Sequence, residues 1–103
     1  MNAYFINFTN HPSSSWSKEQ IKAVREKYDS EIIDVSFPPV SASADESEIK
    51  EQAMKCAERI CGYAPAAVMC QGEFGLTYHV VNMLENMKIF ISQPMRAKTD
   101  KVQ

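Results

Sequence analysis

The chain has 103 residues, of which 45% are hydrophobic and 23% are charged, and its formal net charge is −2. This size and balance are typical of one globular domain, so we expect a single domain over residues 1–103 with little room for a deep internal cavity. The slight acidic excess disfavours a protein that binds duplex nucleic acid, because such proteins usually need a basic face.

The sequence pattern favours a cytoplasmic protein over a membrane or exported one. Its apolar runs are far shorter than the roughly 20 residues of a membrane span, and residues 1–8 lack the basic and then apolar order of a signal peptide. The three cysteines, Cys56, Cys61 and Cys70, form no CxxC pair. We interpret them as unpaired thiols in a reducing compartment, with Cys56 and Cys70 as packing residues rather than catalytic thiols.

The first part of the chain predicts a strand, a polar loop and a helix. Residues 4–8 (YFINF) are aromatic and β-rich, which predicts the strand. The polar loop Thr9–Ser15 follows. Ser17 and Gln20 then have the spacing of a capping box, and apolar residues recur at helical spacing, so we predict a helix from Ser17 to Tyr28.

The middle of the chain repeats this order. Residues 31–35 (EIIDV) predict a second strand, which ends before Pro38. Asp45 and Glu48 again have capping-box spacing. They begin a predicted amphipathic helix, which Gly62 closes.

The last part predicts two further strands with a helix between them. Residues 66–70 (AAVMC) are apolar without alternation, which is typical of a central parallel strand covered on both faces. The loop 71–75 follows, then apolar residues at helical spacing over 76–87 and a short strand over 88–92. Residues 93–103 are polar, and we expect them to form a partly flexible tail.

Alternating strands and helices indicate an α/β domain with a mostly parallel sheet and helices on both faces. Since parallel crossovers are right-handed, the most economical arrangement of about four strands has the order 2-1-3-4. Ligands of such sheets bind at the carboxyl ends of the strands, where the chain reverses direction across the sheet. The loops 9–15 and 71–75 flank this point between strands 1 and 3, so we place the candidate site between them.

These two loops carry groups suited to an anion. The first supplies hydroxyl groups, the Asn10 amide and the His11 imidazole, and the second contains Gly72 and Gly75, which permit close backbone approach. Each loop leads into a predicted helix start, where backbone N–H groups and the helix dipole favour negative charge. We therefore expect a phosphate-containing ligand.

Several motifs are missing from the sequence. Neither GxxxxGK[ST] nor GxGxxG occurs, which disfavours a P-loop hydrolase and a dinucleotide enzyme. The absence of GxSxG disfavours an esterase. There is no HExxH and no other metal-ligand spacing, so we expect neither a metal nor an organic cofactor.

Three loop residues are the candidates for catalysis. His11 can act as a general acid or base, Ser13 can bind a phosphate oxygen, and Glu73 can bind a ribose hydroxyl or act as a base. Each has a plain alternative: an exposed loop histidine, a turn serine and a solvated loop carboxylate. The candidates for ligand contact are Thr9, Asn10, Ser14, Gln71, Gly72, Phe74, Thr77 and Arg96.

The segment Asn7–Pro12 (NFTNHP) after the opening strand, followed by a helix and Ile32–Val35 (IIDV), resembles the small stand-alone CRISPR-associated Rossmann-like proteins. These proteins are similar to CARF domains. The loop Gln71–Phe74 (QGEF) with Leu76–Tyr78 (LTY) fits the second ligand loop of such a domain. The resemblance implies a three-layer Rossmann-like fold.

It also implies a homodimer in antiviral defence that binds a cyclic oligoadenylate across its two-fold axis. Several members of the family are ring nucleases, which end type III CRISPR signalling by cutting cyclic tetra-adenylate. They need no metal, because the ribose 2′-hydroxyl attacks the adjacent phosphate and the enzyme supplies positioning and charge stabilisation. By this resemblance the phosphates would be held by Asn10, His11, Ser13 and Ser14, and the ribose or base by Gln71 and Glu73.

Other functions stay open at this stage. The chain can be a non-catalytic nucleotide-binding sensor or regulatory module, or another small phosphate-handling enzyme. It can also be an interaction protein whose loops only close the fold.

Overall fold

The computed structural model describes residues 3–92. The elements in chain order are β1 (Ala3–Thr9), a short 3-10 helix η1 (Ser13–Ser15), α1 (Lys18–Tyr28), β2 (Ser30–Ser36), α2 (Glu46–Cys61), β3 (Ala67–Gln71) and α3 (Phe74–Asn86). This confirms the α/β class, because each strand is followed by a helix as the hydrophobic pattern predicted.

The strands form a parallel sheet with the order β2-β1-β3, so that β1 is central. Thr9 at the end of β1 lies opposite Ser36 of β2 and Gln71 of β3. The carboxyl ends of the three strands therefore meet at one edge of the sheet. The loops after β1 and β3 start from paired positions there, as the sequence predicted.

The prediction of a fourth strand over residues 88–92, and with it the four-strand order 2-1-3-4, was wrong for the described part of the chain. This segment contributes one isolated parallel bridge, between Ile91 and Val68. Val68 also pairs with Ile6 of β1, so the bridge lies on the outer side of β3. Two backbone hydrogen bonds flank this bridge, from the Val68 N–H to the Phe90 carbonyl and from the Ser92 N–H to the Val68 carbonyl.

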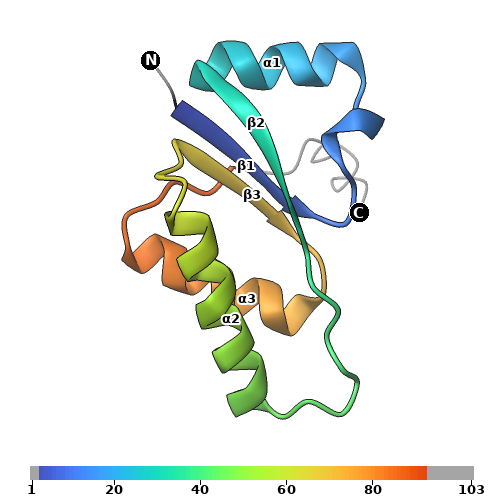
Figure 1. Cartoon of the computed structure of the whole chain (residues 1–103), viewed down its shortest axis with the longest axis vertical. Coiled ribbons are helices and arrows are strands. Elements are labelled where there is room, and N and C mark those ends of the chain that lie inside the picture. The colour runs from blue at the N-terminus through green and yellow to red at the C-terminus, as the bar shows by residue number, and fades with distance from the viewer. Residues whose placement is uncertain (1–2, 93–103) are drawn as a thin grey trace, which may run out of the picture.

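Helices cover both faces of the sheet, with α1 on one face and α2 and α3 on the other (Figure 1). Ile6 and Phe8 of β1 belong to the larger core, on the side of α2 and α3. Phe5 belongs to a smaller cluster with Val24 of α1. Since side chains alternate along a strand, the polar Asn7 and Thr9 share the α1 face with Phe5.

Both predicted capping boxes are confirmed. Ser17 and Gln20 exchange hydrogen bonds at the start of α1, and Asp45 and Glu48 do so at the start of α2. The backbone N–H of Glu48, with the Ser47 hydroxyl, lowers the pKa of Asp45. None of the helices within residues 3–92 has the length and apolar content that a membrane crossing requires.

Candidate functional site

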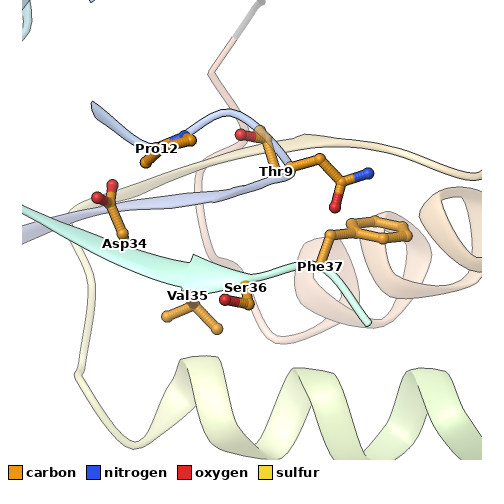
Figure 2. Close-up of a pocket in the computed structure, with 7 residues that line it drawn as sticks. Thr9, Pro12, Asp34, Val35, Ser36 and Phe37 are labelled. Carbon is orange, nitrogen blue, oxygen red and sulfur yellow. The ribbon is translucent and has the colours of Figure 1, made fainter. Parts of the chain in front are cut away.

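A pocket of about 320 Å³ lies at the carboxyl ends of β1 and β2. Figure 2 shows Thr9 and Pro12 from the end of β1 and its loop, and Asp34 and Phe37 from β2 and the residue after it. The lining residues are Thr9, Asn10, Pro12, Asp34, Val35, Ser36 and Phe37. The pocket therefore differs from the expected site, which lay between strands 1 and 3.

Phe37 explains why the space beside β3 is filled. Phe37 directly follows β2, and its ring packs near the end of β1. The centroid of this ring lies 4.9 Å from the centroid of the Phe8 ring. The far side of the Phe37 ring contacts Gly72, where an added Cβ would come within 2.6 Å of the ring. Phe37 is only 6% exposed. The glycine that was expected to admit a ligand instead admits this aromatic ring.

A buried amide holds the loop after β1. The side chain of Asn7 is 1% exposed, and its Nδ2 donates to the backbone carbonyl of His11 and to Oδ1 of Asp34, each at 2.9 Å. A buried polar group of this kind is stabilising when its hydrogen bonds are satisfied and destabilising when they are lost. Asn7 thus ties the loop to both β1 and β2.

Thr9 strengthens the same turn. Its Oγ1 accepts the backbone N–H of His11 at 3.0 Å. The single hydroxyl proton has two acceptors within reach, Oδ1 of Asn7 at 2.9 Å and the carbonyl of His11 at 3.1 Å. The backbone at His11 is therefore anchored through both its N–H and its carbonyl.

Asp34 anchors the next part of the loop. Its two carboxylate oxygens accept the backbone N–H of Ser13 at 3.1 and 3.2 Å, and Oδ2 accepts the Ser13 hydroxyl at 3.2 Å. The amide of Asn7 is a further donor to this carboxylate. Charge-assisted hydrogen bonds are stronger than neutral ones, so Asp34 determines where η1 begins.

Some candidate side chains of the first loop are exposed, whereas others are hydrogen-bonded within the protein. His11, Asn10 and Ser14 are exposed, and Asn10 also lines the pocket. The Ser13 hydroxyl is engaged with Asp34. Ser15, the last serine of this loop, donates its hydroxyl to the carbonyl of Pro12 at 2.8 Å and so stabilises the turn.

The two helix starts are capped by the chain's own side chains. Ser17 accepts the backbone N–H of Gln20 at the start of α1. At the start of α3, the carboxylate of Glu73 accepts the N–H of Leu76 at 2.7 Å. The Glu73 carboxylate thus occupies the position expected for a bound anion, and α3 begins at Phe74 rather than at residue 76.

The remaining candidates follow β3 and are not gathered around the pocket. Gln71 is half-buried at the strand end, whereas the side chain of Phe74 is 84% exposed. The Thr77 hydroxyl oxygen is buried, so it does not face a ligand at the surface. Arg96 lies outside the residues that the structure describes.

The cysteines of the described chain are unpaired. Burial raises the pKa of the Cys70 thiol to about 12 and also raises the pKa of Cys56. Both groups are therefore protonated near neutral pH, and a protonated thiol is a poor nucleophile. This agrees with their interpretation as packing residues.

The site offers little for a metal ion. Residues 3–92 contain no group of three or more histidine, cysteine or acidic side chains placed to share one. Among the described residues that line the pocket, Asp34 alone carries a charge. The pocket is therefore built from one carboxylate, short polar side chains and the apolar walls of Pro12 and Phe37.

Sequence reasoning missed Asn7 and Asp34 as site residues. Both were read as parts of predicted strands, although each is a polar residue between apolar neighbours near a strand's carboxyl end. In a parallel strand buried on both faces, apolar residues are expected throughout. An amide or carboxylate in that position is the signal that could have found them.

Comparison with protein-family models gives a match that covers most of the chain. A family model described as "Uncharacterized protein MJ1673 family" matches residues 3–103. Searches of curated proteins and of solved structures found no match. Because the family model covers nearly the whole sequence, the chain belongs to the MJ1673 family.

Proposed function

We propose that the protein is a Rossmann-like, CARF-like module that binds a nucleotide at the carboxyl end of its sheet, with cyclic oligoadenylate as the ligand. The supporting features are a parallel sheet with a central β1, a pocket at the strand ends and a loop with exposed polar side chains after β1. The proposed setting is type III CRISPR antiviral defence, as the sequence resemblance implies, and the proposed location is the cytoplasm, as the sequence pattern favours.

The observation that carries the proposal is the anchored loop after β1. The Asn7 amide and the Thr9 hydroxyl hold both backbone groups of His11, and Asp34 holds Ser13. A loop that is ordered before the ligand arrives loses less conformational entropy on binding. The anchors leave Asn10 and His11 exposed beside the pocket, where they can meet a ligand.

Binding without cleavage is the function that the geometry favours. Of the three catalytic candidates, the Ser13 hydroxyl is hydrogen-bonded to Asp34 and the Glu73 carboxylate caps α3. For a nuclease, only His11 of the three is left to accept the proton of the attacking hydroxyl. Binding alone needs no such group.

A metal-independent ring nuclease is the second candidate, and the exposed His11 on an anchored backbone favours it. In that reaction the His11 imidazole takes the proton of a ribose 2′-hydroxyl, and the 2′-oxygen forms a bond to the adjacent phosphorus. The bond from phosphorus to the 5′-oxygen breaks, and that oxygen takes up a proton. The products are a 2′,3′-cyclic phosphate and a 5′-hydroxyl.

We also propose that two copies of the chain share one ligand. A cyclic oligoadenylate with a two-fold axis presents the same groups to both copies, and closed two-fold dimers are the commonest assemblies of soluble proteins. Native mass spectrometry with and without the ligand tests the dimer directly.

Incubation with labelled cyclic tetra-adenylate in the presence of EDTA tests the function. Retention of the intact ring supports the binding module, and linear products ending in a 2′,3′-cyclic phosphate support the nuclease. If cleavage occurs, His11→Ala should abolish it and Ser15→Ala should not. Neither retention nor cleavage at high protein concentration contradicts both functions, and favours another phosphate-handling enzyme or an interaction protein.

A further inference from the structure

We infer that the pocket between β1 and β2 takes the nucleoside part of a ligand, its sugar hydroxyls or base amino group, and keeps the phosphate outside. This inference rests on the proposed function, because it assigns one portion of the same ligand. It differs from the sequence-based expectation, in which the first loop held phosphate through Ser13. The reason lies in the charge and the hydrogen-bonding capacity of Asp34.

Asp34 makes the pocket unfavourable for an anion. Among residues 3–92 it is the one charged residue of the pocket lining, and it is exposed. A phosphate placed beside this carboxylate would be repelled, and no lysine or arginine within residues 3–92 lines the pocket to offset the repulsion. A neutral moiety meets no such repulsion.

The same carboxylate can accept a hydrogen bond from the ligand. A carboxylate has roughly four lone-pair sites. Within residues 3–92 three donors make four contacts with this carboxylate. The Asn7 amide reaches Oδ1, the backbone N–H of Ser13 is shared by both oxygens, and the Ser13 hydroxyl reaches Oδ2. The contact from the Ser13 hydroxyl is exposed and 3.2 Å long, so a ribose hydroxyl or an amino group of the ligand can take its place at Oδ2.

The shape and walls of the pocket suit one nucleoside. Its volume of about 320 Å³ lies near the lower end of the roughly 300–1,000 Å³ that is usual for ligand pockets. Pro12 and Phe37 give apolar walls, and the Thr9 and Ser36 side chains are polar groups in the same lining. A whole cyclic oligonucleotide would extend beyond this space.

The phosphate then has a place outside the pocket. His11 and Ser14 lie on the same loop, are exposed, and are absent from the pocket lining. A ligand whose nucleoside enters the pocket would direct its phosphate towards this rim.

Titrations of the full chain with adenosine, AMP and cyclic tetra-adenylate, followed by NMR, test the inference. We expect adenosine to bind at least about fivefold more tightly than AMP, since the carboxylate repels the phosphate at short range. Asp34→Asn should weaken adenosine binding by about tenfold, as expected for the loss of a hydrogen bond to a charged group. The same variant should reduce the discrimination between adenosine and AMP.

Two further variants keep the inference testable if Asp34→Asn loosens the loop. Glu31→Gln removes one exposed negative charge from the same strand outside the pocket, and it should leave both affinities within about twofold. Asn10→Asp adds a charge to the pocket without touching the Asp34 anchors. It should weaken AMP further, by about fivefold, and affect adenosine less.

The outcomes separate this inference from the proposed function. Binding of adenosine that depends on Asp34 supports the inference even if the cyclic ligand does not bind, in which case the proposed function fails alone. Binding of the cyclic ligand with no dependence on Asp34 and no binding of adenosine overturns the inference and keeps the function. Tighter binding of AMP than of adenosine, or no binding of any of the three ligands, also overturns the inference.

Discussion

The end of β2 and the end of β3 lie on either side of Thr9 in the central strand, and polar or glycine-containing segments lie near both. At β2 the carboxylate of Asp34 holds the neighbouring loop, and a pocket lies beside it. At β3 the ring of Phe37 covers Gly72, and Glu73 caps the following helix. Similar residue types thus give a pocket on one side and a packed surface on the other.

The difference teaches that a polar loop at a strand end is not enough to define a site. What distinguishes the two sides is whether an apolar side chain of the protein already fills the space. Phe37 does so at β3, and it simultaneously forms one wall of the pocket at β2. The variants below test this division, from the largest expected effect to the smallest.

Removal of the ring at position 37 should have the largest effect on stability. Phe37→Ala deletes a side chain that is 94% buried between Phe8 and Gly72, and we expect a loss of about 3 kcal/mol in the free energy of unfolding. Urea denaturation measures this loss. Phe37→Leu, which keeps most of the apolar volume, should lose less than half as much, and equal losses would contradict the packing role.

Gly72→Ala should destabilise the fold by about 1–3 kcal/mol, because the added Cβ overlaps the Phe37 ring and forces it to move. The backbone conformation is not the cause, since Gly72 does not have a positive φ. In the Phe37→Ala background the same change should be nearly neutral. Additive effects in this double-mutant cycle would show that the two residues are not in contact.

Asn7→Ala should destabilise the chain by about 1–2 kcal/mol, since it leaves the carbonyl of His11 and one oxygen of Asp34 with fewer donors. The same variant should speed hydrogen exchange of the Ser13 amide, which Asp34 holds. Asn10→Ala, in the exposed part of the loop, is the matched control. If hydrogen exchange at Ser13 is unchanged in Asn7→Ala, the side-chain amide of Asn7 does not hold the loop in place.

Glu73→Ala should have the smallest effect, a loss of about 1 kcal/mol through the missing N-terminal cap of α3. Glu73→Ser should recover most of it, because serine also caps helices. Thermal unfolding measures both variants. Neither variant should change ligand affinity by more than about twofold. A large loss of affinity would indicate that Glu73 contacts the ligand.

The parts of the fold that depend on local sequence were predictable. The capping boxes at Ser17 and Asp45 are local hydrogen-bond patterns, and both formed as predicted. The pairing of Thr9 with Gln71 follows from alternating strands and helices in a parallel sheet. The segment 88–92 has the apolar composition of a strand, but it pairs with β3 only through the bridge between Ile91 and Val68, and composition does not show how far a strand pairs.

The candidate site was only partly predictable, because it depends on contacts between distant segments. The loop residues Asn10 and His11 were identified from their polarity after a strand. The contact between the Phe37 ring and Gly72 is a tertiary contact, and no local sequence pattern predicts it. Asn7 and Asp34 belong to different strands, and the hydrogen bond between them becomes visible only when the strands pair.

The most direct test of this division is a map of backbone amide shifts as cyclic tetra-adenylate or adenosine is titrated into the labelled protein. We expect the largest shifts at residues 9–13 and 34–37, around the pocket, and small shifts at residues 71–76. The largest shifts at residues 71–76 instead would place the ligand beside β3, and would contradict the assignment of the site to the ends of β1 and β2.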